Sequence, residues 1–99
     1  NKVSIASRLL SEQRAALAAV TAARRRLGLL IDTALPNAES AFDASLQGYA
    51  VGKFDLTTTI EARSALIDTR RAVLGAKTTL RIETARLKSL IGDAPFSGD

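Results

Sequence analysis

The segment Gly48 to Leu56 (GYAVGKFDL) is the strongest helix-breaking signal in the chain, and it separates two long helix-forming arms. Its two glycines lie four residues apart and relax the backbone. Asp55 offers a side-chain oxygen that can cap the helix after it. The pattern therefore predicts an all-α fold in which the chain doubles back into a long antiparallel helical hairpin with a defined tip.

The expected elements fill the 99-residue chain as one segment. At about 1.5 Å per residue the second helix would be about 54 Å long, and the first would be longer, so the arms are unequal. Gly92 suits the left-handed position that follows a helix. The expected boundaries are a first helix over about residues 3–50, a tip turn over about 50–55, a second helix over about 56–91 and a C-terminal tail over 92–99.

Apolar residues recur every seven positions along the first arm, which is typical of a coiled-coil seam. A flanking line widens the apolar face, so one hairpin cannot cover all of it. We expect a bundle or a ring of helices, and self-association of the isolated chain. The first line is Val3, Leu10, Leu17, Arg24, Ile31, Ala38 and Ser45; the second is Ala6, Gln13, Val20, Leu27, Ala34 and Ala41; the flanking line is Leu9, Ala16, Ala23 and Leu30.

Pro36 interrupts the first arm, because it lacks a backbone N–H and clashes with the carbonyl four residues back. The heptad pattern continues in register across it, which favours one kinked helix. The alternative is a loop near residues 35–37, which would give a three-helix bundle.

The second arm carries two similar lines of large apolar residues with alanines between them. The alanines permit close approach of a neighbouring helix while the larger side chains fill the holes. One line is Leu66, Val73, Leu80 and Leu87; the other is Ile60, Ile67 and Leu74; the alanines are Ala62, Ala65, Ala72 and Ala76.

The composition excludes several kinds of chemistry. The chain has no cysteine and no histidine, so disulfides, thiol chemistry, imidazole catalysis and the usual zinc sites are excluded. No nucleophile with a base and no paired carboxylates stand out. Glu39 and Asp43 share a helix face but are typical of surface charges. We therefore expect no enzyme activity, no cofactor and no metal site.

The formal charge of +4 and the pI near 10.1 raise the question of nucleic acid. Lysines and arginines are spread over both arms and interleaved with ten acids, and the run Arg24 to Arg26 points in three directions around a helix. This favours a solvated face over a phosphate-binding patch. The sequence contains no uninterrupted apolar stretch of about 20 residues and opens on no signal peptide. Its start at Asn1 is typical of a segment cut from a longer protein.

Two interpretations of the tip residues remain open at this stage. Tyr49 and Phe54 flank the turn and could be hydrophobic plugs that close the end of the hairpin. They could equally belong to a contact surface, since Lys53, Asp55 and the amides around Gly52 lie where a partner can reach them. The threonine run 57–59 is expected to form the first turn of the second helix.

Several short patterns, taken together in their order, resemble the TolC-like outer membrane efflux proteins. Within that family the chain is most similar to the heavy-metal cation efflux (Czc-type) and related branches. The most discriminating element is the Tyr-x-x-Gly tip at its distance from the flanking patterns. The patterns are Leu-Pro-x-Ala-x-x-Ala at 35–41, Gly-Tyr-x-x-Gly at 48–52, Asp-Leu at 55–56, Ala-Arg-x-x-Leu at 62–66 and Leu-x-x-Leu-x-Gly at 87–92.

The resemblance implies a periplasmic piece of a trimeric channel of the outer membrane, working in a tripartite pump. In that family the hairpin belongs to a helical barrel, and its tip closes the channel entrance at rest and meets the periplasmic adaptor. The homologous first hairpin and the strands of the family's outer-membrane barrel are not in this sequence, so the chain would be unable to transport by itself. Substrate choice would lie with the inner-membrane pump.

The resemblance also implies roles for tip residues. Tyr49 matches the family's tip tyrosine, which takes part in the polar network that holds the entrance shut. Gly52 matches the tip glycine that lets the backbone approach the adaptor, and Val51 lies in the same turn. The family often has a basic residue two positions after that glycine, where this chain has Phe54, with Lys53 one position earlier.

Two other function classes compete with a channel segment. A structural or signalling coiled coil would use the hairpin only to oligomerise, and a basic helical nucleic-acid binder would show salt-dependent binding to DNA. Contact between the tip and an adaptor hairpin separates the first of these from the channel.

Overall fold

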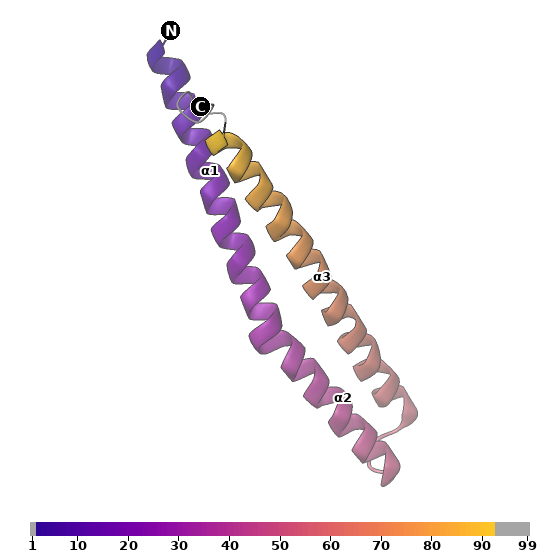
Figure 1. The fold of residues 1–99 in the computed structure, drawn as a ribbon. Helices are drawn as coiled ribbons and strands as arrows, with labels where there is room; N and C mark the ends of the chain where they lie inside the picture. The colour runs from indigo at the N-terminus through magenta and orange to yellow at the C-terminus, as the bar shows by residue number, and fades with distance from the viewer. Residues whose placement is uncertain (1, 93–99) are drawn as a thin grey trace.

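The computed structural model describes residues 2–92, which form two antiparallel helical arms (Figure 1). The first arm runs through α1 (Lys2–Leu29), a short π-helix η1 (Leu30–Ala34) and α2 (Leu35–Ala50). The second arm is α3 (Leu56–Gly92), and no strand occurs within the described residues. The predicted all-α hairpin is confirmed. The predicted C-terminal tail lies outside the described residues, apart from Gly92, which is the last residue of α3.

The hairpin is a thin rod of 72 × 25 × 17 Å. The first arm continues past the end of α3, with the N-terminal turns of α1 projecting beyond it (Figure 1). A rod of two helices cannot enclose a deep core, and no large side chain in the described part of the chain is fully buried. The fold is therefore held by one narrow seam between the arms.

On α3 the seam follows one heptad line of large residues together with Ala76, which is 4% exposed, and leaves the other line more exposed. Leu66 and Val73 are buried, and they belong to the predicted line that continues through Leu80 and Leu87, which are half-buried. Leu74, in the other line, is 64% exposed. A strict seven-residue repeat thus places a single edge of α3 against the first arm, as in a coiled coil.

On α1 the buried residues are mostly small. Ala16, Val20 and Ala23 are the best-buried apolar residues of this helix, with 3–6% exposure. Leu10 and Leu17, from the first heptad line, are 47% and 56% exposed. The expectation that this first line belongs to the seam is wrong for α1. Val20 of the second line and the alanines of the flanking line form the seam, because small residues let α3 approach closely, and the leucines of the first line face outward.

The π-helix explains how the first arm passes Pro36. The N–H of Leu35 donates to the carbonyl oxygen of Leu30, five residues back instead of four. The wider turn accommodates a proline that cannot donate to, and would clash with, the carbonyl of Asp32. The chain therefore continues as one bent helix with Pro36 in the first turn of α2, and the alternative with a loop at 35–37 is wrong.

The π-turn also shifts the buried line of the first arm by one residue. Before it the buried positions belong to the second and flanking heptad lines. After it Ala38 and Phe42 are half-buried and Ser45 is buried, while Ala41 is exposed. One extra residue in the turn changes which side of the helix faces α3, so that α2 can stay in contact with it.

The seam predicts a clear contrast between two leucines of α3. We expect Leu66→Ala to lower the free energy of unfolding by about 2–4 kcal/mol, because Leu66 is only 5% exposed and its removal leaves a cavity. Leu74→Ala, the matched control at 64% exposure, should change it by less than about 0.5 kcal/mol. Urea denaturation at one fixed protein concentration, followed by helical circular dichroism, measures both. Equal losses would contradict the seam.

Candidate functional site at the hairpin tip

The turn at the tip is a Schellman motif that ends α2. The Lys53 N–H donates to the Gly48 carbonyl at 2.7 Å, and the Gly52 N–H donates to the Tyr49 carbonyl at 3.1 Å. These are the two bonds by which the motif satisfies the last carbonyls of a helix. Gly52 takes the left-handed position with φ of 76°, the single positive φ in the described residues. Glycine is required there because a side chain would be strained.

Phe54 closes the turn by packing on Gly48. Its N–H donates to the Gly48 carbonyl at 3.2 Å. A Cβ added to Gly48 would lie 2.7 Å from Cε2 of the Phe54 ring and closer still to Cδ2. Gly48 is buried although it lies near the end of the rod. The phenyl ring of Phe54 therefore occupies the space that a side chain at position 48 would fill.

Asp55 begins α3 as its N-cap. Its Oδ1 accepts a bond from the Thr58 N–H at 2.9 Å and another from the Thr58 hydroxyl at 2.8 Å. The backbone bond satisfies one of the N–H groups that have no partner within a helix. The hydrogen bonds from the backbone and the side chain of Thr58 lower the pKa of the Asp55 carboxyl, because they favour its charged form.

A polar contact fastens the two arms just above the turn. The Thr59 hydroxyl donates to the Ser45 carbonyl at 3.3 Å, across the seam from α3 to α2. Both residues are buried, at 7% and 4% exposure. The Ser45 hydroxyl in turn donates to the Phe42 carbonyl at 2.7 Å. These hydrogen bonds thus connect the two arms directly beside the turn.

The tip presents apolar side chains to solvent. Val51 is 77% exposed, Tyr49 46% and Phe54 42%. An open groove of about 440 Å³ lies on the α2 side, where Gly48, Val51, Lys53 and Phe54 meet Ala44 and Gln47. An exposed apolar patch with a cation at its edge can bind another protein surface, and the residues that line this groove include no nucleophile paired with a base.

The structure brings the predicted site residues together around the turn, with different functions for each. Lys53 and Phe54 line the groove with Val51, whereas Gly52 and Asp55 shape the backbone. Tyr49 lies in the last turn of α2. Phe54 supports both earlier interpretations, since its ring packs on Gly48 and is still partly exposed.

Sequence reasoning missed three contacts that stabilise the tip. Gly48 is predicted from the sequence only to relax the backbone, because the packing of the Phe54 ring on it depends on the path of the turn. Thr58 is predicted only to lie in the first turn of the second helix, and the structure shows in addition that its hydroxyl donates to Asp55. The link from Thr59 to Ser45 has no signal in the sequence, because it depends on the register of the arms.

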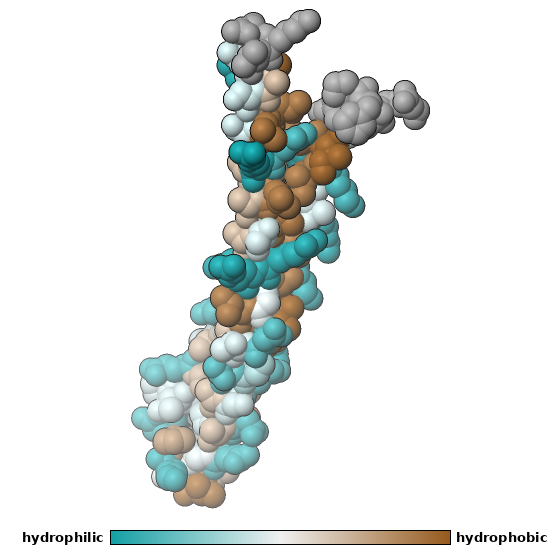
Figure 2. Space-filling view, turned by 90° about the vertical axis from the view of Figure 1, so that its left-hand side faces the viewer, coloured by the Kyte–Doolittle hydropathy of each residue, from teal (hydrophilic) through white to brown (hydrophobic). Residues whose placement is uncertain are grey.

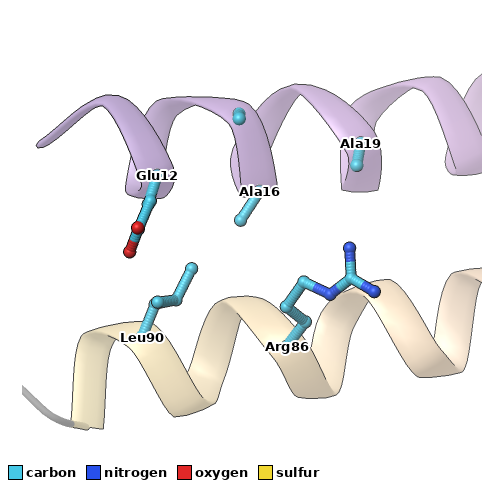
Figure 3. A pocket seen from close by; sticks show the side chains of 6 residues that line it. Glu12, Ala16, Ala19, Arg86 and Leu90 are labelled. Carbon is cyan, nitrogen blue, oxygen red and sulfur yellow. The ribbon is translucent and has the colours of Figure 1, made fainter. Parts of the chain in front are cut away.

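A second cavity lies at the opposite end of the seam (Figure 3). It has a volume of about 340 Å³, and Glu12 from α1 and Arg86 from α3 extend into the space between the arms beside Ala16, Ala19 and Leu90. The Arg86 guanidinium lies 3.6 Å from the Glu83 carboxylate on its own helix. Small alanines leave this gap open, and the residues around it provide no catalytic arrangement.

Two further observations concern the residues that the structure describes. No three acidic, histidine or cysteine residues there are grouped so that they could hold a metal ion. No helix in this part of the chain combines the length and the hydropathy needed to cross a membrane.

Comparison with protein families decides the assignment. The model of the family described as "Outer membrane efflux protein" matches residues 6–93, almost the whole chain. This chain belongs to the outer membrane efflux protein family. A search of curated proteins and a search of solved structures each gave no match. The family is one of channels and transporters, so the chain is a component of an outer membrane efflux channel and its family is not enzymatic.

The packing of the Phe54 ring on Gly48 can be tested by mutation in this efflux protein. We expect Gly48→Ala to lower the free energy of unfolding by about 1–2 kcal/mol, because the ring must leave its place. Gly75→Ala, at an exposed position in α3 with open space around it, should instead stabilise by about 0.5–1 kcal/mol. In a Phe54→Ala background the loss caused by Gly48→Ala should disappear. A loss that persists there would refute the packing of Phe54 on Gly48.

The lowered pKa of Asp55 gives a pH dependence with a definite sign. A carboxyl whose pKa is lower in the folded state stabilises fully above its unfolded pKa of about 4, and the contribution is lost as the pH falls through the folded pKa. Asp55→Asn keeps an oxygen for the cap and removes the titration. We expect the difference in melting temperature between wild type and Asp55→Asn to shrink between neutral pH and the acid range. A difference independent of pH would contradict the charged cap.

Proposed function

We propose that this chain is the periplasmic helical-barrel segment of a trimeric outer membrane efflux channel in a tripartite pump. Its tip would contact the periplasmic adaptor protein and gate the channel entrance. The observation that carries the proposal is the tip itself: a braced turn at the end of a 72 Å rod that exposes Tyr49, Val51 and Phe54 beside Lys53. Apolar and aromatic side chains on a rigid support are typical of protein contact sites.

The outward leucines support the assembly into a ring. Leu10, Leu17 and Leu74 remain about half exposed or more after the hairpin has closed its own seam. Figure 2 shows hydrophobic residues along the face of the rod that lies on the α1 side. Neighbouring hairpins in a homotrimeric channel would cover these side chains, and the isolated chain would self-associate through them.

Gating would use the bend in the first arm. The π-helix at Leu30–Ala34 separates α1 from α2, which lies nearer the tip, and π-turns are frequent at functional sites. The link from Thr59 to Ser45 keeps α2 and the start of α3 together below the bend. α2 and the start of α3 would then move as one unit when an adaptor binds, and this movement would widen the channel entrance.

The branch of the family is a proposal that rests on the resemblance of the sequence patterns. We place the chain in the heavy-metal cation (Czc-type) branch, with the substrate chosen by the inner-membrane pump. The chain has neither cysteine nor histidine, the ligands that soft and borderline metals prefer, so it would not select the metal.

Binding to a synthetic adaptor hairpin tests the proposed tip contact. We expect Tyr49→Ala to weaken binding about tenfold, since it removes an exposed aromatic contact. Gly52→Pro should weaken it as well, because proline cannot adopt a φ of 76° and removes the N–H that bonds to Tyr49. Fluorescence anisotropy measures the affinity, and circular dichroism verifies the helices. Leu74→Ala, far from the tip, is the control. Unchanged binding in both tip variants would refute the proposal.

A further inference from the structure

Two neighbouring faces of α2 could pack against α3, and the structure uses only one of them. The face in contact consists of Ala38 and Phe42, which are half-buried, and Ser45, which is 4% exposed. The unused face lies one position earlier in each case, and its residues are all exposed. It consists of Asn37, Ala41 and Ala44.

The unused face is the one that an uninterrupted α-helix would turn toward α3. It continues, at seven-residue spacing, the two heptad lines that hold the buried residues of α1. Ala41 and Ala44 are small, like the alanines over which α3 approaches α1. The sequence therefore contains a second register for α2, displaced from the observed one by one residue, or about 100° around the helix. The lines are Ala16, Ala23, Leu30, Asn37 and Ala44, and Val20, Leu27, Ala34 and Ala41.

The π-turn that selects the observed register has a local cause. No residue of η1, Leu30–Ala34, is buried, so packing against α3 does little to impose the wide turn. Pro36 follows directly after the N–H of Leu35 that bonds to the Leu30 carbonyl. In a regular α-helix this proline would leave the Asp32 carbonyl without a donor and would clash with it. Pro36 is thus the feature that keeps α2 out of the second register.

The hydrogen bond between the arms below the bend can be exchanged. The Thr59 hydroxyl donates to the Ser45 carbonyl at 3.3 Å, and it also lies 3.5 Å from the Asp55 carbonyl of its own helix. If Ser45 turned away, this hydroxyl would keep an acceptor, and no buried donor would be left without a partner. The bond accompanies the observed register but does not fix it.

We propose that α2 has two registers against α3 and that Pro36 holds it in the observed one. In the second register α2 continues α1 as a plain α-helix, with Ala41 and Ala44 on the seam. In the observed register Ala44 lines the tip groove together with Val51. The second register would draw Ala44 into the seam and remove that wall of the groove. Pro36 is therefore a positioning residue for the groove at the tip.

The consequence of this role for partner binding rests on the proposed function. In a channel, the outward leucines of α1 would contact neighbouring hairpins while the tip contacts the adaptor. The rotation of α2 relative to α1 then decides whether both contacts can form at once, and packed helices change between discrete arrangements rather than continuously. Pro36→Ala should therefore weaken binding of the adaptor hairpin without altering any tip residue.

Disulfide trapping measures the register directly, because the 99-residue chain has no cysteine of its own. Ser45→Cys/Thr59→Cys joins the arms in the observed register, and Ala44→Cys/Thr59→Cys joins them in the second one. A disulfide requires Cα atoms within about 7 Å and Cβ atoms that point toward each other. We expect the pair 45/59 to oxidise faster when Pro36 is present. Pro36→Ala should reverse the order of the two rates.

Deletion of Thr33 provides the matched control. Thr33 is an exposed residue of η1, and its removal takes out the one extra residue of the wide turn. In a Pro36→Ala chain that lacks Thr33, a plain α-helix turns Ser45 back toward α3, so the pair 45/59 should again oxidise faster. A general loosening of the arm would not be reversed by shortening it. Circular dichroism verifies the helices, and mass spectrometry distinguishes bridges within one chain from those between two chains.

Three results would overturn the inference. The first is an unchanged preference for the pair 45/59 in Pro36→Ala, which would show that packing sets the register. The second is a preference that is lost in Pro36→Ala and not restored by deletion of Thr33. The third is loss of helix in Pro36→Ala, since no α-helical register would then be available. The oxidation assay contains no adaptor, so failure of the unaltered chain to bind an adaptor hairpin would refute the proposed function alone.

Discussion

The close approach of α3 to α1 over alanine is the contact on which the rest of the hairpin depends. Ala16 and Ala23 are almost fully buried, and they face an edge of α3 that contributes larger side chains such as Leu66 and Val73 farther along the seam. Each small residue buries little apolar area by itself, but it allows dispersion contacts along the whole seam. The described residues of this thin rod have no second layer to pack against, so the apolar contacts between the arms lie along this seam.

The bend in the first arm is a consequence of that seam. Pro36 cannot take part in a regular α-helix interior, and a simple break would have separated α2 from α3. The π-turn at Leu30–Ala34 removes the clash and keeps the helix continuous. It also turns Ala38 and Ser45 toward α3, so that the lower seam can be fastened by the bond from Thr59 to Ser45. The rigidity of the tip therefore depends on the register in which the two arms pack above it.

The surfaces left after the seam is closed divide the rod into regions with different chemistry. The tip exposes Val51 and Tyr49 to solvent, and the outer face of the upper arm exposes Leu17. Membership of the outer membrane efflux protein family gives these surfaces a common context. A channel segment must bind neighbours along its sides and a partner at its end. Such an assembly requires apolar faces that a single hairpin leaves uncovered.

The sequence by itself determined the all-α hairpin, its turning point and its family resemblance. Gly52 and Asp55 act locally, through a positive φ and a helix cap, so their effects can be inferred from neighbours in the chain. The heptad line of α3 was predictable for the same reason, because its period is a property of one helix.

The tertiary structure decided which apolar line of the first arm is buried. Leu10 and Ala16 lie in neighbouring lines, and periodicity gives both a place on the apolar face; only the distance between the helices selects the alanine. The bond from Thr59 to Ser45 depends likewise on both arms, because it joins residues 14 positions apart in the chain. Packing is a property of both arms together, and a one-dimensional pattern does not contain their register.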